Sequence, residues 1–307
     1  IPTLMKSGYY YAHADLRVEQ RPVPAIGDNE VLAAVHACGI CGSDTMRWYR
    51  EPEAAKRGAL NTGHEIAGQI VAVGGGVSGY KTGDRVVITH HFPCLKCTAC
   101  LDGNETACEA MHTKHIDPGG FAQYVRILES GIVNGLYRFP ETMSYEEASF
   151  VEPLACVVRA VRKTLPVQGR SALVIGSGLA GLLYIKVLRA MGAGRIIAAD
   201  MNQQRLDAAV RSGADEGVMA NGKLPSADRV VLCTGAPAAA TPTMFEADPQ
   251  VGMAVRNLAR DVRVPLLFGS DQEENDGDGP RLYNAAFMLG PAGNTTGVYR
   301  KINLVPW

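Results

Sequence analysis

The sequence predicts an α/β protein with a β-rich N-terminal domain, a second domain built on a parallel sheet, and an atypical C-terminal segment. Short apolar or alternating runs bounded by turn residues occupy the first part of the chain, for example 29–35, 68–74 and 85–88, as expected for strands. From residue 172 onward, buried strands and helices alternate strictly. That alternation predicts right-handed crossovers within one parallel sheet.

The second domain is expected to begin with a capped helix. Ser144 and Glu147 form a capping-box pattern ahead of an apolar helix that we expect to be interrupted near Pro153. The elements predicted after it are strands at 172–175, 195–199 and 228–233 and helices at 179–191 and 203–212. The expected domains are 1–150 and 151–236, with 237–307 as the atypical segment.

The segment after about Pro237 has a different pattern. Residues 248–259 predict a capped amphipathic helix, and 263–268 predict a buried strand that would extend the parallel sheet. The acidic, glycine-rich stretch 271–280 reads as a loop too short for a crossover helix. A strand at 281–289 is therefore expected to be antiparallel.

Composition excludes several function classes. The 307 residues, enough for about two domains, carry 30 Lys+Arg and 31 Asp+Glu, a net charge of −1. There is no basic surplus to bind nucleic acid or an anionic membrane. No apolar run is long enough to span a bilayer, and the first residues lack the pattern of a signal peptide. We expect a cytoplasmic protein.

Four cysteines predict a metal site. Cys94, Cys97, Cys100 and Cys108 lie within fifteen residues, in a lobe at about 90–110. Such spacing closes a tetrahedral thiolate site with no open position, which is typical of structural zinc. An iron–sulfur cluster is the chemical alternative, and disulfides or a chance cluster are the others.

A glycine-rich turn predicts a dinucleotide site. Gly176, Gly178 and Gly181 form a GxGxxG that follows a buried strand and opens a helix, and Asp200 ends the next strand. The glycines suit a tight turn, close approach of a pyrophosphate, and helix–strand packing. A carboxylate at Asp200 would accept from a ribose hydroxyl and repel a 2′-phosphate, which favours NAD over NADP. The alternative is a glycine-rich turn with a solvated aspartate. Two further residues are assigned to this cofactor site: Leu179 and Arg205.

A third set of residues is dispersed along the chain. Cys41, His64, Glu65 and Glu152 offer a thiolate, an imidazole and carboxylates, which are suitable ligands for a catalytic zinc with one open position. Spacing alone does not show that they converge. Taken singly, Cys41 also reads as a buried small residue, His64 as a core histidine and Glu152 as a surface charge.

Together these motifs resemble the zinc-dependent medium-chain alcohol dehydrogenases, in particular the polyol type that includes sorbitol and threonine dehydrogenases. The resemblance covers residues 5 to about 236. It implies a GroES-like catalytic domain, a Rossmann domain and hydride transfer from a secondary alcohol or polyol to NAD. The stretches that carry it are Cys41-Gly42-Ser43-Asp44, Gly63-His64-Glu65, the four-cysteine lobe, Gly119 to Tyr124, Glu152 to Ala155 and the glycine fingerprint.

The resemblance also implies residue roles. Cys41 and His64 match catalytic zinc ligands, Glu65 a third ligand or its exchange partner, and Glu152 an alternative ligand or the group holding a zinc-bound water. Ser43 matches the hydroxyl that contacts the substrate oxygen. Asp44 is expected to brace the ligands. The cysteines expected to be buried thiols are Cys38, Cys156 and Cys233. The histidines expected to be structural or to line the cleft are His90, His91, His112 and His115.

The segment from about Ala236 onward resembles a different family, the carbon–nitrogen hydrolase domain of apolipoprotein N-acyltransferase. That family needs a Glu–Lys–Cys triad. Lys301 matches the lysine, Ala238 stands at the glutamate position, and no cysteine matches the nucleophile. Two alternatives to an active dehydrogenase follow: a chimeric or truncated chain that binds only zinc and NAD, or a hydrolase remnant. The chain could form a homo-oligomer, but we expect the C-terminal segment to complete the sheet without the native dimer edge.

Overall fold

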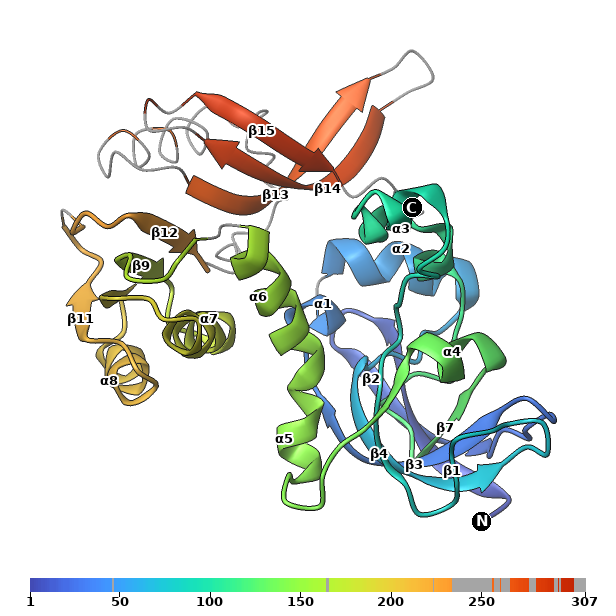
Figure 1. Cartoon of the computed structure of the whole chain (residues 1–307). Helices are drawn as coiled ribbons and strands as arrows, with labels where there is room; N and C mark the ends of the chain where they lie inside the picture. Colours follow the sequence, from blue (N-terminus) through green and yellow to red (C-terminus); the bar gives the residue numbers. More distant parts are fainter. Residues whose placement is uncertain are drawn as a thin grey trace. The chain divides into compact units, whose positions relative to one another are not determined.

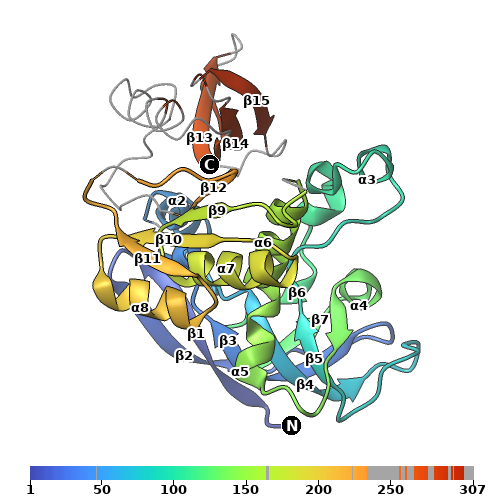
Figure 2. The ribbon, with the colours of Figure 1, turned by 60° about the vertical axis from the view of Figure 1, so that its left-hand side comes forward.

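The structure is a computed structural model in which the chain divides into two compact units, Ile1–Pro153 and Leu154–Pro306. It describes residues 1–45, 47–163, 166–222, 224–233, 256, 260, 266–275, 280–289, 292 and 294–300. Figures 1 and 2 show the elements from two sides. Lys301, Ala238 and most of the helix predicted at 248–259 lie outside the described residues.

The first unit is built on an antiparallel sheet of order β6-β7-β3-β4-β5-β8. Its core contains Ile66, Ile70 and Ile127, each at most 1% exposed. A separate hairpin pairs β1 (Leu4–Ala12) with β2 (Asp15–Pro22). The sheet strands are β3 (Val31–Gly39), β4 (Glu65–Val73), β5 (Arg85–Ile88), β6 (Ile116–Asp117), β7 (Tyr124–Ile127) and β8 (Leu136–Arg138).

Short helices connect these strands. The longest is α2, which was not predicted because Pro52 interrupts its pattern and proline is unfavourable inside helices. Helix α2 spans Arg47–Arg57. The other helical segments are α1 (Gly42–Thr45), α3 (Thr98–Leu101), the 3₁₀ turns Glu105–Ala107 and Glu109–His112, and α4 (Glu129–Asn134).

The capping box at Ser144 is confirmed, but the predicted helix break is displaced. Ser144 accepts from the backbone N–H of Glu147, whose side chain accepts in return from the Ser144 N–H. Helix α5 (Tyr145–Ser149) is followed by its C-cap residue, Phe150, and α6 (Val151–Lys163) begins directly after this residue. Pro153 lies in the first turn of α6, where a backbone N–H has no intrahelical partner to lose. The predicted interruption near Pro153 therefore lies at Phe150, just ahead of the proline.

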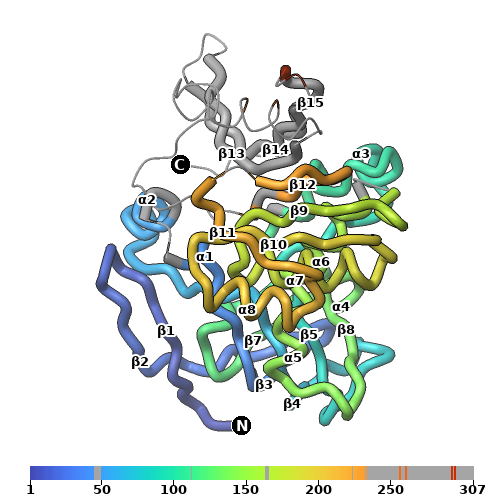
Figure 3. Tube along the Cα trace, turned by 90° about the vertical axis from the view of Figure 1, so that its left-hand side faces the viewer, coloured from blue at the N-terminus to red at the C-terminus, as the bar shows by residue number. Residues whose placement is uncertain are grey.

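The second unit contains a sheet of order β11-β10-β9-β12-β13-β14-β15. Neighbouring strands from β11 to β13 are parallel, so the predicted α/β fold class is confirmed. Figure 2 shows α7 and α8 beside this sheet, and Figure 3 shows β11, β10, β9 and β12 side by side. The elements are β9 (Ala172–Ile175), α7 (Leu179–Ala190), β10 (Ile196–Asp200), α8 (Gln203–Arg211), β11 (Glu216–Met219) and β12 (Arg229–Leu232).

The C-terminal strands extend the sheet in the predicted directions. β13 (Leu266–Asn275) is parallel to β12, and β14 (Pro280–Leu289) is antiparallel to β13. β15 (Thr295–Arg300) adds a further antiparallel strand. The prediction of a loop was wrong over 271–275, because the acidic stretch continues β13 to Asn275 and obtains backbone partners along β14. Residues 276–279 lie outside the described residues. Among the described residues, no helix has the length and apolar character needed to cross a bilayer.

Candidate metal and dinucleotide sites

Pairing of β3 with β4 brings together three of the dispersed residues. Cys41 follows the end of β3, His64 precedes β4, and Glu65 is the first residue of β4, directly opposite Gly39. The sulfur of Cys41, a ring nitrogen of His64 and a carboxylate oxygen of Glu65 all lie within 4.8 Å of one another. This set of one sulfur, one nitrogen and one oxygen can hold a divalent metal and leave a position open.

Asp44 lies behind two of these side chains. Its carboxylate accepts from the backbone N–H of Cys41 at 3.0 Å and approaches the Nδ1 atom of His64 at 3.6 Å. The Asp44 side chain is only 3% exposed. A buried carboxylate on a ligand histidine fixes the orientation of the ring, which is the bracing arrangement expected for Asp44.

Mutual hydrogen bonding perturbs Cys41 and His64. The hydrogen bond with His64 lowers the pKa of the Cys41 thiol. Burial opposes protonation of His64, but hydrogen bonds with Asp44 and Cys41 outweigh it and raise the pKa of His64 to about 10. The lowered pKa of Cys41 favours the thiolate, which is the form of cysteine that binds metal.

Glu152 lies near this group without joining it. It is the second residue of α6, and burial raises the pKa of its carboxyl, with smaller electrostatic contributions from His64, Glu65 and Asp44. Its carboxylate is not among the three ligand atoms that lie within 4.8 Å of one another. Ser43 is partly exposed on α1.

The neighbouring histidines differ in their surroundings. The His90 ring lies 4.8 Å from that of His64 and 3.9 Å from that of His91, measured between centroids. His115 is 2% exposed and joins Ser130 to the 110–113 turn through both ring nitrogens. The side chain of His112 lies outside the described residues. Cys38 packs against the core, where burial raises the pKa of its thiol to about 12. The prediction that Cys156 is buried was wrong, because its thiol is exposed on α6.

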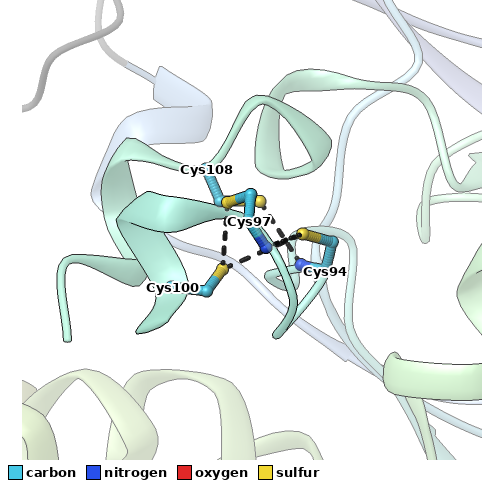
Figure 4. A group of neighbouring side chains, drawn as sticks. All are labelled: Cys94, Cys97, Cys100 and Cys108. Atoms are coloured by element: carbon cyan, nitrogen blue, oxygen red, sulfur yellow. Dashed lines mark hydrogen bonds between the residues drawn. The ribbon is translucent and has the colours of Figure 1, made fainter. Parts of the chain in front are cut away.

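The four cysteines of the lobe form a compact group (Figure 4). Their sulfurs lie within 4.8 Å of one another, with 3.5 Å between Cys97 and Cys100 and 4.0 Å between Cys94 and Cys100. Sulfurs around one tetrahedral zinc are expected about 3.8 Å apart, from a Zn–S length of about 2.3 Å. Backbone N–H groups of Lys96 and Cys97 lower the pKa of Cys94 to about 6. All four thiols are free, so the geometry suits a metal rather than disulfides.

The glycine fingerprint occupies the point where the strand order of the second unit reverses. β9 pairs with β10 on one side and β12 on the other, and Gly176 follows β9 with φ +94°. A Cβ at Gly181 would overlap the carbonyl oxygen of Gly176, whereas Gly178 has open space around it. Gly178 is the N-cap of α7, and because glycine has no side chain, no capping group covers the backbone N–H groups there. Open backbone at a helix N-terminus is suited to a phosphate group.

Asp200 connects this turn to the next strand. One carboxylate oxygen accepts from the backbone N–H of Ser177 at 2.7 Å, and the other accepts from that of Asn202 at 2.9 Å. Arg205 lies 4.0 Å from the same carboxylate with a side chain 61% exposed. Leu179, the first residue of α7, is 46% exposed. The residues assigned to the cofactor thus gather around the loops that follow β9 and β10.

Sequence reasoning missed two residues of the first site. Arg50 on α2 contacts Asp44, and Gly39 lies against Glu65. No local motif marks either one. The cross-strand register of β3 and β4 is the signal that could have identified Gly39, because it places that residue opposite Glu65.

Comparison with known proteins identifies two regions. Residues 27–136 match the model of the alcohol dehydrogenase GroES-like domain, and residues 234–306 match that of the carbon-nitrogen hydrolases. Sorbitol dehydrogenase of Bacillus subtilis (strain 168) is 34% identical over 220 residues, covering 70% of this chain and 61% of that protein. The chain spans about three-fifths of the length of the curated relatives it matches.

Solved structures agree with this similarity. The 2R,3R-butanediol dehydrogenase of Bacillus subtilis superposes with a TM-score of 0.65 at 27% identity, covering 84% of this chain and 73% of that one. A structure titled short chain alcohol dehydrogenase, from Escherichia coli CFT073 and complexed with NADH, gives 0.64 at 25% identity, covering 80% and 73%. Residues 27–136 therefore match an alcohol dehydrogenase GroES-like domain, and the chain is similar to zinc-dependent medium-chain alcohol dehydrogenases of the polyol type.

Proposed function

We propose that this protein oxidises a secondary alcohol or polyol by transferring a hydride to NAD, with Cys41, His64 and Glu65 holding a catalytic zinc. The observation that carries the proposal is the convergence of these three ligand atoms within 4.8 Å. A thiolate, an imidazole and a carboxylate match the donor preferences of zinc, and three protein ligands leave one position for substrate. Bound there, zinc would supply Lewis acidity that lowers the pKa of a substrate hydroxyl.

The residues around the open position would orient the substrate and carry its proton. The Ser43 hydroxyl, two residues beyond Cys41, would contact the substrate oxygen and pass on its proton. Glu152 would hold a water or replace Glu65 as a ligand. Asp44, already bound to the Cys41 backbone and close to His64, would keep both ligands in place.

The other cofactor sites follow from their own geometry. Cys94, Cys97, Cys100 and Cys108 would hold a structural zinc, because four thiolates fill a tetrahedral shell. NAD would place its pyrophosphate at the N-terminus of α7, against Gly176, Gly178 and Leu179, and its adenosine ribose near Asp200 and Arg205. Bound NAD would supply the hydride acceptor.

The substrate class is inferred from the relatives and from the ligand set. A sorbitol dehydrogenase and a butanediol dehydrogenase are among the proteins that resemble this chain, which favours a small polar alcohol with adjacent hydroxyls. The match of 234–306 to carbon–nitrogen hydrolases favours no second activity, since Ala238 stands where that family has its glutamate.

A zinc count with a matched thiol control tests the proposal. The purified protein should contain about two zinc ions per chain, one for each site, and should generate NADH absorbance from a secondary alcohol. Cys41→Ser should lose one ion and all turnover, whereas Cys156→Ser, which changes an exposed thiol outside both groups, should lose neither. An unchanged zinc content in Cys41→Ser would refute the catalytic site. If the unmodified chain holds two zinc ions but shows no turnover, the result would support the alternative of a protein that only binds zinc and NAD.

A further inference from the structure

Arg50 supplies a positive charge to the buried carboxylate behind the candidate zinc ligands. Its Nη2 lies 3.1 Å from the Oδ1 atom of Asp44, and its Nε donates to the backbone carbonyl of Ser43 at 2.8 Å. The Arg50 side chain is 14% exposed and that of Asp44 is 3% exposed. One guanidinium on α2 thus binds both a side chain and the backbone of α1.

Asp44 reaches from this ion pair to both ligand-bearing segments. Its Oδ2 accepts from the backbone N–H of Cys41 at 3.0 Å. Its Oδ1 accepts from the N–H of Gly63 at 3.4 Å and lies 3.6 Å from the Nδ1 atom of His64. The orientation of this single carboxylate therefore affects the loop carrying Cys41 and the loop carrying His64 together.

The surrounding charges explain why the carboxylate needs a cation. Glu65 and Glu152 are further acidic groups close enough to interact electrostatically with Asp44, and a metal-binding Cys41 would add a thiolate. A buried carboxylate left without its partner is strongly destabilising. Without Arg50, Asp44 would be expected to turn towards water, and this change would release the two loops.

We propose that Arg50 is a positioning residue for the catalytic zinc, holding Asp44 and the Ser43 carbonyl so that Cys41 and His64 stay aligned as ligands. This inference rests on the metal site of the proposed function. The planar guanidinium is essential to it, because two of its nitrogens reach two acceptors at fixed angles. A lysine ammonium offers a point charge without that geometry.

A chelator challenge of the zinc-loaded protein tests this role, with release followed by a chromogenic zinc indicator. The two zinc sites should give two release phases, and Cys41→Ser identifies the phase of the catalytic site by removing it. Arg50→Gln should accelerate that phase by about 10- to 100-fold, the range seen when outer partners of metal ligands are lost. The four-cysteine phase should remain unchanged and so report an intact fold.

Two further variants separate geometry from charge. Arg50→Lys should give an intermediate release rate, because it keeps the charge but not both hydrogen bonds. Arg57→Gln removes an exposed arginine from the same helix, where it pairs with Glu53, and should release zinc as the unmodified protein does.

Three results would overturn the inference. Equal acceleration of both phases in Arg50→Gln would mean that Arg50 only supports the fold. An unchanged release rate from the catalytic site in Arg50→Gln would mean that Arg50 does not hold the zinc ligands in place. A single zinc phase in the unmodified protein, indifferent to Cys41→Ser, would remove the proposed function itself. That outcome is distinguishable from the first two, in which the catalytic phase is present.

Discussion

The carboxylate of Glu65 lies against the α-carbon of Gly39, in the space that a Cβ on residue 39 would occupy. The two residues face each other across β3 and β4. Glu65 is 5% exposed, so its carboxylate has little freedom to move aside. The missing side chain at residue 39 is therefore what allows a carboxylate to lie beside Cys41 and His64.

Gly39→Ala is expected to push Glu65 away from the other two ligands. Zinc affinity at that site and turnover should each fall by about 10- to 100-fold, as for other perturbations next to metal ligands. Metal analysis and NADH production measure the two effects. Gly75→Ala is the matched control, since a Cβ at Gly75 meets nothing within 4 Å. Full zinc and full turnover in Gly39→Ala would show that Glu65 is not needed as a ligand.

Asp200→Asn is expected to weaken NADH binding by about tenfold, the effect of losing one charge-assisted hydrogen bond. Asparagine has one acceptor oxygen, but Asp200 now accepts from both Ser177 and Asn202. Removing the negative charge should also reduce discrimination against NADPH. Fluorescence titration with each nucleotide measures both effects without requiring turnover.

Asp207→Asn serves as the control for the dinucleotide site. Asp207 is an exposed residue of α8 that accepts from Gln203, and its replacement should leave NADH affinity unchanged. Equal affinities for Asp200→Asn and the unmodified protein would argue that the ribose does not bind at the end of β10.

The parts of the sites that could be predicted from sequence are the local ones. The four cysteines and the glycine fingerprint each lie within a short stretch, and the geometry of a tetrahedral site or a strand–turn–helix constrains that spacing. Cys41 and Glu65 are separated by a helical connection, and the β3–β4 register brings them together. Only the family resemblance predicted that they converge, because no pattern in the sequence encodes the register directly.

The errors in predicted secondary structure have a similar origin. Helix α2, which carries Arg50, has Pro52 inside it, and local propensity therefore argued against a helix. The short edge strand β11 alternates between exposed and partly buried residues, and its pattern was too weak to identify. Acidic residues at 271–275 suggested a loop, but pairing with β14 satisfies their backbone groups. In each case a tertiary contact outweighed the local preference.

Cys97→Ser is expected to remove the zinc of the four-cysteine lobe and leave the other ion bound. The Cys97 sulfur lies 3.5 Å from that of Cys100, so its loss opens the tetrahedral shell. Stability should fall by about 4 kcal/mol where free zinc exceeds the dissociation constant about a thousandfold. Urea unfolding with and without zinc measures this change. A variant that retains both ions would contradict a four-thiolate site.

His115 is expected to make the folded state less stable as the pH falls below neutrality. Burial, opposed by a hydrogen bond to the Ala110 carbonyl, lowers the pKa of His115 below its ordinary value of 6.5. Its Nδ1 lies 2.9 Å from the Ser130 hydroxyl, and its ring packs at a tilt against that of Phe92, with 3.9 Å between centroids. These contacts suit a neutral imidazole that accepts at Nδ1 and donates at Nε2.

The sign of the pH dependence follows from proton uptake. Unfolded chains protonate this histidine near pH 6.5, whereas the folded protein resists protonation until the pH falls further. The free energy of unfolding should therefore decrease as the pH drops through 6.5, with a slope of up to about 1.4 kcal/mol per pH unit from this residue. His115→Asn should be less stable at pH 8 but should lose this part of the slope. Urea unfolding from pH 8 to 5.5 measures the difference, with exposed His13 replaced by Gln as the control. Parallel pH profiles for His115→Asn and the unmodified protein would show that His115 binds its proton equally in both states.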